Sequence, residues 1–120
     1  SDKKIYSTWI KNHQEPFLCF DSTNNIAENQ WHHFAVAVSD SGNTGYLNGV
    51  EITNRDYNFG SASDKHFLSS ISTKEIFTLG YGRSSYMIGK DFMYYKGLLD
   101  DLRVYDKSLS GEEIKKLVRK

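Results

Sequence analysis

The end of the chain carries three local signals in a fixed order, and together they restrict the fold more than any other stretch. Residues 98–105 (LLDDLRVY) alternate along two faces, which predicts a β-strand. A short turn follows at residues 106–108. Ser110 stands three residues before Glu113, and this spacing of a hydroxyl and a carboxylate predicts a capping box. We therefore expect a strand, a turn and then a helix over residues 111–118.

The parity of this strand places a carboxylate on an apolar face. Because alternate residues of a strand point to the same side, Asp100 shares a face with Leu98, Leu102 and Val104. We expect this face to be buried, and a buried carboxylate without a partner costs several kcal/mol in lost hydration. The expected partner of Asp100 is a Lys or Arg side chain, a set of backbone amides or a metal ion.

Shorter runs elsewhere in the chain also have strand character. Residues 31–39 are nearly continuous in apolar side chains after two histidines, which is typical of a central strand covered on both faces. The dipeptide Asn48-Gly49 predicts a two-residue hairpin turn of type I′. Strands are also expected at residues 4–10 and 17–21, which should form a hairpin around a turn at residues 11–16. Further strands are expected at residues 44–47, 50–54 and 75–81, with loops at residues 22–29, 55–65 and 82–91. Strands at such short intervals predict an all-β sandwich or jelly roll.

The length and composition fit a single domain and do not indicate a nucleic-acid partner. A chain of 120 residues suits a single domain with one core. Its 15 basic and 15 acidic residues cancel, and no basic block is present, so we expect no nucleic-acid partner. No apolar run reaches the roughly 20 residues of a membrane-spanning helix. Cys19 is the single cysteine, so it has no internal disulfide partner, and we expect a small buried apolar side chain there.

The sequence shows no spacing typical of a catalytic or zinc site. His32 and His33 are adjacent, so on a strand they point to opposite faces and cannot readily bind one ion together. The acidic pair at residues 100–101 is divided between faces in the same way. The pair at residues 112–113 falls in the first helical turn, where negative charge suits the helix dipole. Neither pair resembles the acid and nucleophile of a glycosidase, so we expect no enzymatic activity.

Four aromatic residues in or beside loops are candidates for ligand binding. An exposed aromatic ring next to Asn or Asp can stack on a sugar ring, while the neighbouring side chain binds the sugar hydroxyls. In the alternative interpretation, these rings close the ends of the sandwich core. The four candidates are Tyr57, Phe59, Tyr86 and Tyr94.

Three motifs carry a family resemblance. Residues 30–38 (QWHHFAVAV) form a W-H-H strand, residues 45–50 (GYLNGV) form a Y-h-N-G hairpin in which h is apolar, and residues 97–114 (GLLDDLRVYDKSLSGEEI) form a D-D strand followed by L-S-x-x-E-I. In order and spacing they resemble the laminin G-like and pentraxin-like branch of the concanavalin A-like lectin and glucanase superfamily. The resemblance implies a jelly-roll sandwich of two antiparallel sheets with a short C-terminal helix. The E-x-D-x-E strand of the glycosidase branches has no counterpart here, so the resemblance does not extend to hydrolysis.

The resemblance also implies partners, a cofactor and a location. It implies a binding or adhesion module of a larger extracellular or cell-surface protein, with carbohydrate or protein as its ligand. Asp100 matches the first Asp of the D-D pair, which is a calcium ligand in some relatives, so calcium is the implied cofactor. Relatives begin with strands that this chain lacks, so residues 1–120 are expected to form one partial domain, completed by a neighbouring domain or subunit. Two alternatives stay open: a structural spacer or packing domain, and an accessory domain of a carbohydrate-active enzyme.

Overall fold

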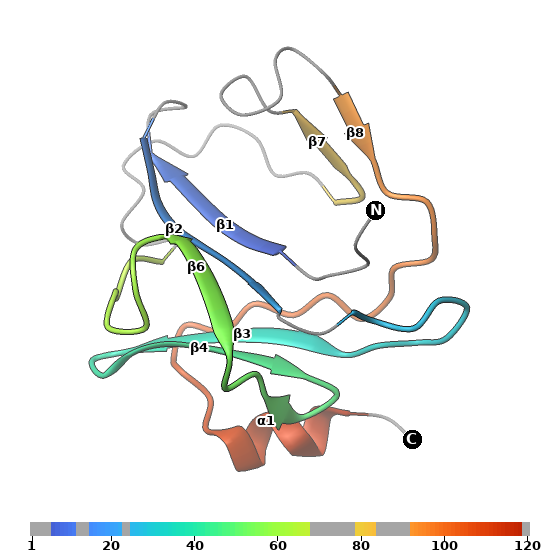
Figure 1. Cartoon of the computed structure of the whole chain (residues 1–120). Coiled ribbons are helices and arrows are strands. Elements are labelled where there is room, and N and C mark those ends of the chain that lie inside the picture. The colour runs from blue at the N-terminus through green and yellow to red at the C-terminus, as the bar shows by residue number, and fades with distance from the viewer. Residues whose placement is uncertain (1–5, 12–14, 23–24, 68–78, 84–91, 119–120) are drawn as a thin grey trace.

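The computed structural model describes residues 6–11, 15–22, 25–67, 79–83 and 92–118, and these residues form antiparallel sheets and one short helix (Figure 1). The first sheet has the order β1-β2-β6, from β1 (Tyr6–Lys11), β2 (Glu15–Ser22) and β6 (Arg55–Phe59). The second sheet has the order β3-β4-β5, from β3 (Phe34–Ser39), β4 (Gly42–Leu47) and β5 (Val50–Glu51). A separate pair joins β7 (Tyr81–Arg83) to β8 (Phe92–Tyr94), and α1 (Gly111–Leu117) follows near the C-terminus.

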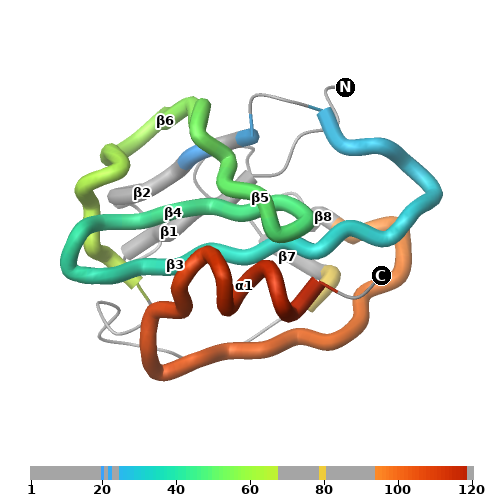
Figure 2. The backbone as a smooth tube through the Cα atoms, turned by 90° about the horizontal axis from the view of Figure 1, so that it is seen from below, coloured from blue at the N-terminus to red at the C-terminus, as the bar shows by residue number. Residues whose placement is uncertain are grey.

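The two three-stranded sheets and the helix form three layers. In Figures 1 and 2 the β3-β4-β5 sheet lies between the β1-β2-β6 sheet and α1. Phe20 of β2 is fully buried between the two sheets. A Cβ atom added to Gly45 of β4 would lie 3.0 Å from the Phe20 ring, so the absence of a side chain at Gly45 allows this close approach.

The first hairpin is confirmed, with one difference at its turn. β1 pairs with β2 in antiparallel register, as the sequence predicts. β2 begins at Glu15, so Pro16, expected in the turn, belongs to the strand and lies opposite Ile10. The register shifts between Trp9 and Ile10. Proline has no N–H to donate to the ladder, and strands accommodate it at such irregularities.

The second hairpin is also confirmed. Asn48 has a φ of 53° and Gly49 a φ of 77°, and positive values at both positions are what a type I′ turn requires. β4 and β5 pair on either side of this turn. The turn lies against the end of α1, because a Cβ atom added to Gly49 would lie 3.0 Å from Cγ2 of Val118. Gly49 is therefore required both for its backbone conformation and for its lack of a side chain.

The C-terminal helix forms where the capping box predicts it. The Ser110 hydroxyl accepts a hydrogen bond from the Glu113 amide at 3.2 Å, and the Glu113 carboxylate accepts one from the Ser110 amide at 2.8 Å. The hydrogen bond from the Ser110 amide, followed by the Ser110 hydroxyl and the charge of Lys107, lowers the pKa of the Glu113 carboxyl. Ile114 is buried, and Gly111 lies against the ring of Tyr46 on β4. Among the described residues, no helix is both long enough and apolar enough to span a bilayer.

The loop predicted over residues 55–65 is wrong in its first half. β6 occupies Arg55–Phe59 and pairs with β2. Arg55, Tyr57 and Phe59 alternate with Asp56 and Asn58, which is a strand period. Polar and glycine-rich neighbours concealed this alternation, and pairing with β2 supplies the hydrogen bonds that the composition alone does not predict.

The strand predicted over residues 31–39 is shorter and less covered than expected. β3 begins at Phe34, and Trp31 precedes it with 64% of its surface exposed. In the described part of the chain β3 pairs with β4 alone, so it is an edge strand, and its side chains are half-buried or exposed. The continuous apolar run of residues 34–38 therefore lies on a strand that has one neighbour, β4, in the described part of the chain.

The strand predicted over residues 98–105 is wrong. These residues join no ladder in the part of the chain that the structure describes, and Asp101 has a φ of 55°, which breaks the alternation of faces. Leu98 is 75% exposed and Val104 is 62% exposed. Asp100 is also exposed, so the expected buried carboxylate is corrected as well. The predicted strand at residues 75–81 lies mostly outside the described residues. The loop predicted at residues 82–91 is corrected at its start, since β7 extends to Arg83, and the rest of it lies outside the described residues.

Candidate functional site

A buried polar network joins the two main sheets and includes the candidate Tyr57. The Arg55 side chain is only 8% exposed. Its Nε donates to the Tyr57 hydroxyl at 2.7 Å, and its two terminal nitrogens donate to the carbonyls of Ile52 and Asn43 at 2.8 and 3.2 Å. The Tyr57 hydroxyl in turn donates to Oδ1 of Asn43 at 2.8 Å. This network connects β6 of one sheet to β4 of the other.

Asn43 extends the network to the loop after β6. Its Nδ2 donates to the carbonyls of Ser61 and Asp64, both at 2.8 Å, and its backbone amide donates to the Ala62 carbonyl at 2.9 Å. Asn43 is buried, so each of these bonds replaces hydration that the amide has lost. The sequence alone does not predict the roles of Asn43 and Arg55, since a strand Asn and a loop-like Arg carry no local signal of this network.

The charge of Arg55 is balanced within the same region. The guanidinium carbon lies 5.7 Å from the ring centroids of both Phe20 and Tyr57, within the range of a cation–π interaction. Glu51 provides a carboxylate at 3.9 Å. The hydroxyl of the half-buried Tyr57 is therefore bonded on both sides, within the contact between β6 and β4.

The two adjacent histidines hold the second hairpin in place. His32 Nε2 lies 2.8 Å from the carbonyl of Ala27, so this nitrogen carries the proton and Nδ1 accepts from Asn48 Nδ2 at 3.1 Å. The His33 amide donates to Oδ1 of Asn48 at 2.9 Å, and the Asn48 amide donates to the His33 carbonyl at 2.7 Å. Both residues thus bind the turn at Asn48, which is a structural arrangement.

The remaining aromatic candidates lie on different sheets. Phe59 ends β6 and is 36% exposed, whereas Tyr94 ends β8 and is 70% exposed. Tyr86 lies outside the described residues. Tyr95, which no sequence motif marks as a candidate, is adjacent to Tyr94 and is also exposed, and its amide donates to the Gly80 carbonyl at 2.8 Å. The exposed aromatic surface of the described chain is therefore richest at Tyr94 and Tyr95.

Asp100 lies a few residues beyond this tyrosine pair, in a cluster of acidic and basic side chains. Its Oδ1 accepts from the Asp101 amide at 2.8 Å. The Asp101 carboxylate accepts from Nε and a terminal nitrogen of Arg103, at 2.8 and 3.0 Å, and this pairing raises the pKa of Arg103. In the described part of the chain, no three His, Cys, Asp or Glu side chains gather as a metal site would require. Calcium takes six to eight oxygen ligands, so these residues alone do not fit a calcium site.

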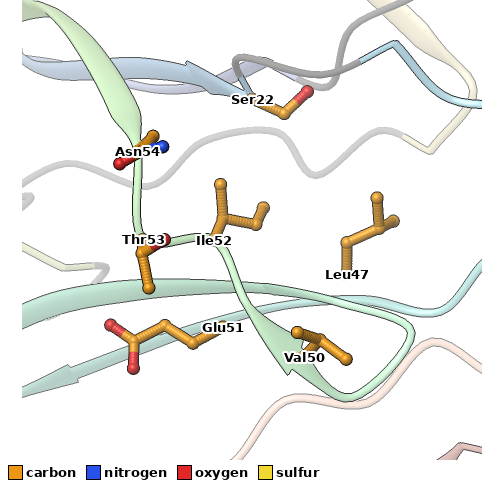
Figure 3. Close-up of a pocket in the computed structure, with 7 residues that line it drawn as sticks. All are labelled: Ser22, Leu47, Val50, Glu51, Ile52, Thr53 and Asn54. Carbon is orange, nitrogen blue, oxygen red and sulfur yellow. The ribbon is translucent and has the colours of Figure 1, made fainter.

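One depression is found at the end of the second hairpin (Figure 3). Its volume is about 200 Å³, which is below the roughly 300 Å³ at which small-molecule pockets begin. Its lining contains no aromatic ring and comes from Ser22, Leu47, Val50, Glu51, Ile52, Thr53 and Asn54. The depression therefore lacks both the size and the aromatic platform of a ligand pocket.

Taken together, these features define an all-β domain of stacked antiparallel sheets whose buried polar groups serve structure. A family profile described as the concanavalin A-like lectin/glucanases superfamily, of laminin G type, matches residues 1–115. The chain belongs to this family, so the predicted concanavalin A-like fold class is confirmed. Among curated proteins, none matches the chain.

A solved structure gives a second comparison. It is the crystal structure at 2.1 Å resolution of an S-layer domain-containing protein, residues 221–444, from Clostridium thermocellum ATCC 27405. The two chains share 28% sequence identity with a TM-score of 0.52. The match covers 84% of this chain but only 45% of the other, so this chain spans less than half of that structure.

Proposed function

We propose that this chain is a non-catalytic binding module of a larger extracellular or cell-surface protein. The observation that carries the proposal is the exposed tyrosine pair, Tyr94 and Tyr95, at the end of β8. Each of these exposed aromatic rings offers a stacking surface for a sugar ring or an apolar patch of a protein. The family membership and the S-layer domain-containing relative support a location at the cell surface.

Carbohydrate is the ligand that a screen can test most directly. The natural full-length protein and its variants Tyr94→Ala and Tyr95→Ala should be applied to an array of cell-wall and extracellular glycans. We expect the wild type to bind and at least one of the two variants to lose binding at least tenfold, because each removes an exposed stacking ring. Trp31→Ala is the matched control, since Trp31 is equally exposed but lies elsewhere. Unchanged binding in both tyrosine variants, an equal loss in all three variants, or no binding by the wild type contradicts a carbohydrate site at the tyrosines.

A structural packing module is the second candidate. It is supported by the run of exposed apolar residues after Gly97, which includes Leu98, Leu102 and Val104. Such a run is typical of a surface that another domain or subunit covers. In this case the protein has no soluble ligand, and a neighbouring domain or subunit completes the sandwich. The role of accessory domain in a carbohydrate-active enzyme rests on the family description alone.

Calcium binding at Asp100 is a separate proposal. Because the described residues supply too few oxygen ligands, further donors must come from elsewhere in the protein. If calcium binds there, added calcium raises the Tm of the full-length wild type and not that of Asp100→Ala. Asp56→Ala, which removes an exposed carboxylate of β6, is the control. A Tm that calcium does not change in the wild type would remove Asp100 as a metal ligand.

A further inference from the structure

In the cluster of His32, His33 and Asn48, backbone groups determine which side-chain atom donates each hydrogen bond. The His33 amide can only donate, so the Asn48 atom that it contacts at 2.9 Å is Oδ1. The Ala27 carbonyl can only accept, so Nε2 of His32, 2.8 Å away, carries a proton. Asn48 Nδ2 therefore faces Nδ1 of His32 at 3.1 Å, and Nδ1 has to accept. This arrangement requires a neutral His32 ring.

A second proton on His32 reverses the role of Nδ1. An imidazolium donates from both nitrogens, so two N–H groups would oppose each other across the 3.1 Å between Nδ1 and Asn48 Nδ2. Turning the Asn48 amide over does not relieve this contact, because Nδ2 would then oppose the His33 amide, which is another donor. The protonated form therefore cannot keep both side-chain bonds of Asn48.

Either movement that separates the two donors breaks a second hydrogen bond. If the His32 ring moves, its bond to the Ala27 carbonyl is lost with it. If the Asn48 side chain moves, the His33 amide loses its acceptor. Residues 25–33 contain no helix or strand, so few other backbone bonds hold this loop to the second hairpin. Protonation of one ring thus releases the loop from the turn at Asn48.

The described contacts of the His32 ring offer no carboxylate to a second proton. Both ring nitrogens bond to uncharged groups, the Ala27 carbonyl and the Asn48 amide. The turn also lies against a basic residue of α1, since a Cβ atom added to Gly49 would lie 3.2 Å from Cα of Lys115. The ionisable side chains on the loop, on the hairpin and on the part of α1 that touches the turn are Glu28, His33, Tyr46, Glu51 and Lys115.

From these contacts we infer that His32 and Asn48 form a pH-sensitive latch, which holds residues 25–31 to the β4–β5 hairpin while His32 is neutral and releases them when the ring gains a proton. Imidazole ordinarily gains this proton near pH 6.5. The open form binds more protons than the closed form, so the closed form is favoured at neutral pH and opens as the pH falls. The released loop carries Trp31, whose side chain is already 64% exposed.

This inference goes beyond the proposed binding function, because it assigns a response to acid to a part of the domain away from the tyrosine pair. It depends on no ligand. If the protein binds its ligand in mildly acidic surroundings, residues 25–31 are the part of the domain that differs from the form at neutral pH.

Hydrogen exchange on the natural full-length protein tests the latch. The amides of His33 and Asn48 bond between the loop and the turn, at 2.9 and 2.7 Å, so their exchange reports on opening. After correction for the intrinsic effect of pH on exchange, we expect their protection to fall ~10-fold between about pH 7.5 and about pH 5.5. The Glu113 carboxyl does not contribute, because its ordinary pKa of 4.5 is lowered further in the fold. Protection that does not change with pH would overturn the inference.

Two variants identify the groups that respond, and a third is the control. His32→Gln removes the titrating ring, so the dependence on pH should disappear. Asn48→Asp replaces the Nδ2 donor by an oxygen that accepts from a protonated His32, so protection should rise in acid instead of falling. Asp at this position also suits a type I′ turn. His66→Gln removes an exposed histidine outside the latch and should behave as the wild type does.

The variants also give results that contradict the latch. A loss of protection in acid that persists in His32→Gln would assign the proton to another group, such as His33, whose Nδ1 is buried with no partner in the described part of the chain. An Asn48→Asp protein that loses protection in acid as the wild type does would show that the Nδ2 donor is not the cause. Glycan binding can fail in the tyrosine variants without any change in these results, so the two proposals are tested separately.

Discussion

Helix α1 and residues 98–105, here called the exposed apolar segment, are neighbours in sequence, yet they differ in what determines their structure. The helix begins at a capping box whose two hydrogen bonds join Ser110 and Glu113, three residues apart. The segment just before it has a strand-like sequence and forms no strand in the described chain. A cap needs only its own residues, whereas a strand needs a partner that supplies backbone hydrogen bonds. A local sequence signal is therefore sufficient to predict structure only where the hydrogen bonds of that structure are also local.

The largest expected effect concerns contacts between residues far apart in sequence. Asn43→Ala removes the side-chain bonds to Ser61, Asp64 and Tyr57 and leaves their buried groups without partners. We expect a loss of about 2–4 kcal/mol in the free energy of unfolding, measured by urea denaturation. Asn54→Ala, at an exposed position just before β6, is the control. A loss below 1 kcal/mol for Asn43→Ala would mean that the network between the sheets contributes little.

The second-largest loss of stability is expected at Gly49, where the turn requires a positive φ. Gly49→Val places a β-branched residue at a φ of 77° and a Cβ atom 3.0 Å from Val118. The strain and the contact with α1 should together cost about 1–3 kcal/mol of unfolding free energy. Asn48→Gly keeps the turn geometry but loses the side-chain hydrogen bonds to the two histidines. Its loss of unfolding free energy therefore measures the contribution of the Asn48 side chain alone. A Gly49→Val protein as stable as the wild type would show that the hairpin tolerates another turn.

The helix cap should give a smaller effect. Ser110→Ala removes the acceptor of the Glu113 amide and should cost about 1 kcal/mol. Ser108→Ala is the control, because Ser108 is exposed and lies outside the cap. If both variants have the same Tm as the wild type, the capping box is not what stabilises α1.

The cap should also depend on pH. The Glu113 carboxyl has a lower pKa in the folded protein than its ordinary value of 4.5. Its contribution is therefore present above about pH 4.5 and decreases as the pH falls through the lower folded value. Glu113→Gln keeps a side-chain oxygen for the Ser110 amide but cannot titrate, so the difference in Tm between wild type and variant should narrow in acid. A difference that stays constant with pH would contradict this linkage.

The smallest effect is expected in the exposed apolar segment of the 120-residue chain. Leu102→Ala removes an exposed side chain, so the free energy of unfolding should change by less than about 0.5 kcal/mol. Leu117→Ala, on the packed side of α1, should cost more. A large loss for Leu102→Ala in this chain would mean that the segment is already covered.

The parts of the structure that the sequence predicts share one property. The hairpin at Asn48 and the cap at Ser110 are made by residues within a few positions of each other, so their signals are visible in the sequence. β6 was missed because its partner β2 lies more than thirty residues earlier, and the composition of residues 55–65 resembles a loop. The overprediction at residues 98–105 is the opposite case, in which the alternation is present and the partner is not described.

The candidate site shows the same distinction at the level of side chains. Tyr57 was a candidate because it lies near loop-forming residues, but Arg55 and Asn43 bind its hydroxyl inside the fold. A sequence cannot distinguish a stacking tyrosine from a bonded one, since the difference lies in residues on another sheet. Exposure identified Tyr95, which has no sequence motif of its own.

The network of Arg55, Asn43 and Tyr57 has a thermal consequence. Apolar surface exposed on unfolding raises the heat capacity change, and polar surface lowers it. Because the contact between the two main sheets includes these buried polar groups beside the Phe20 ring, melting of the 120-residue chain should give a heat capacity increment below the ~12–15 cal/mol/K per residue of ordinary globular proteins. A small increment flattens the curve of stability against temperature, so the link between the sheets should weaken little on cooling.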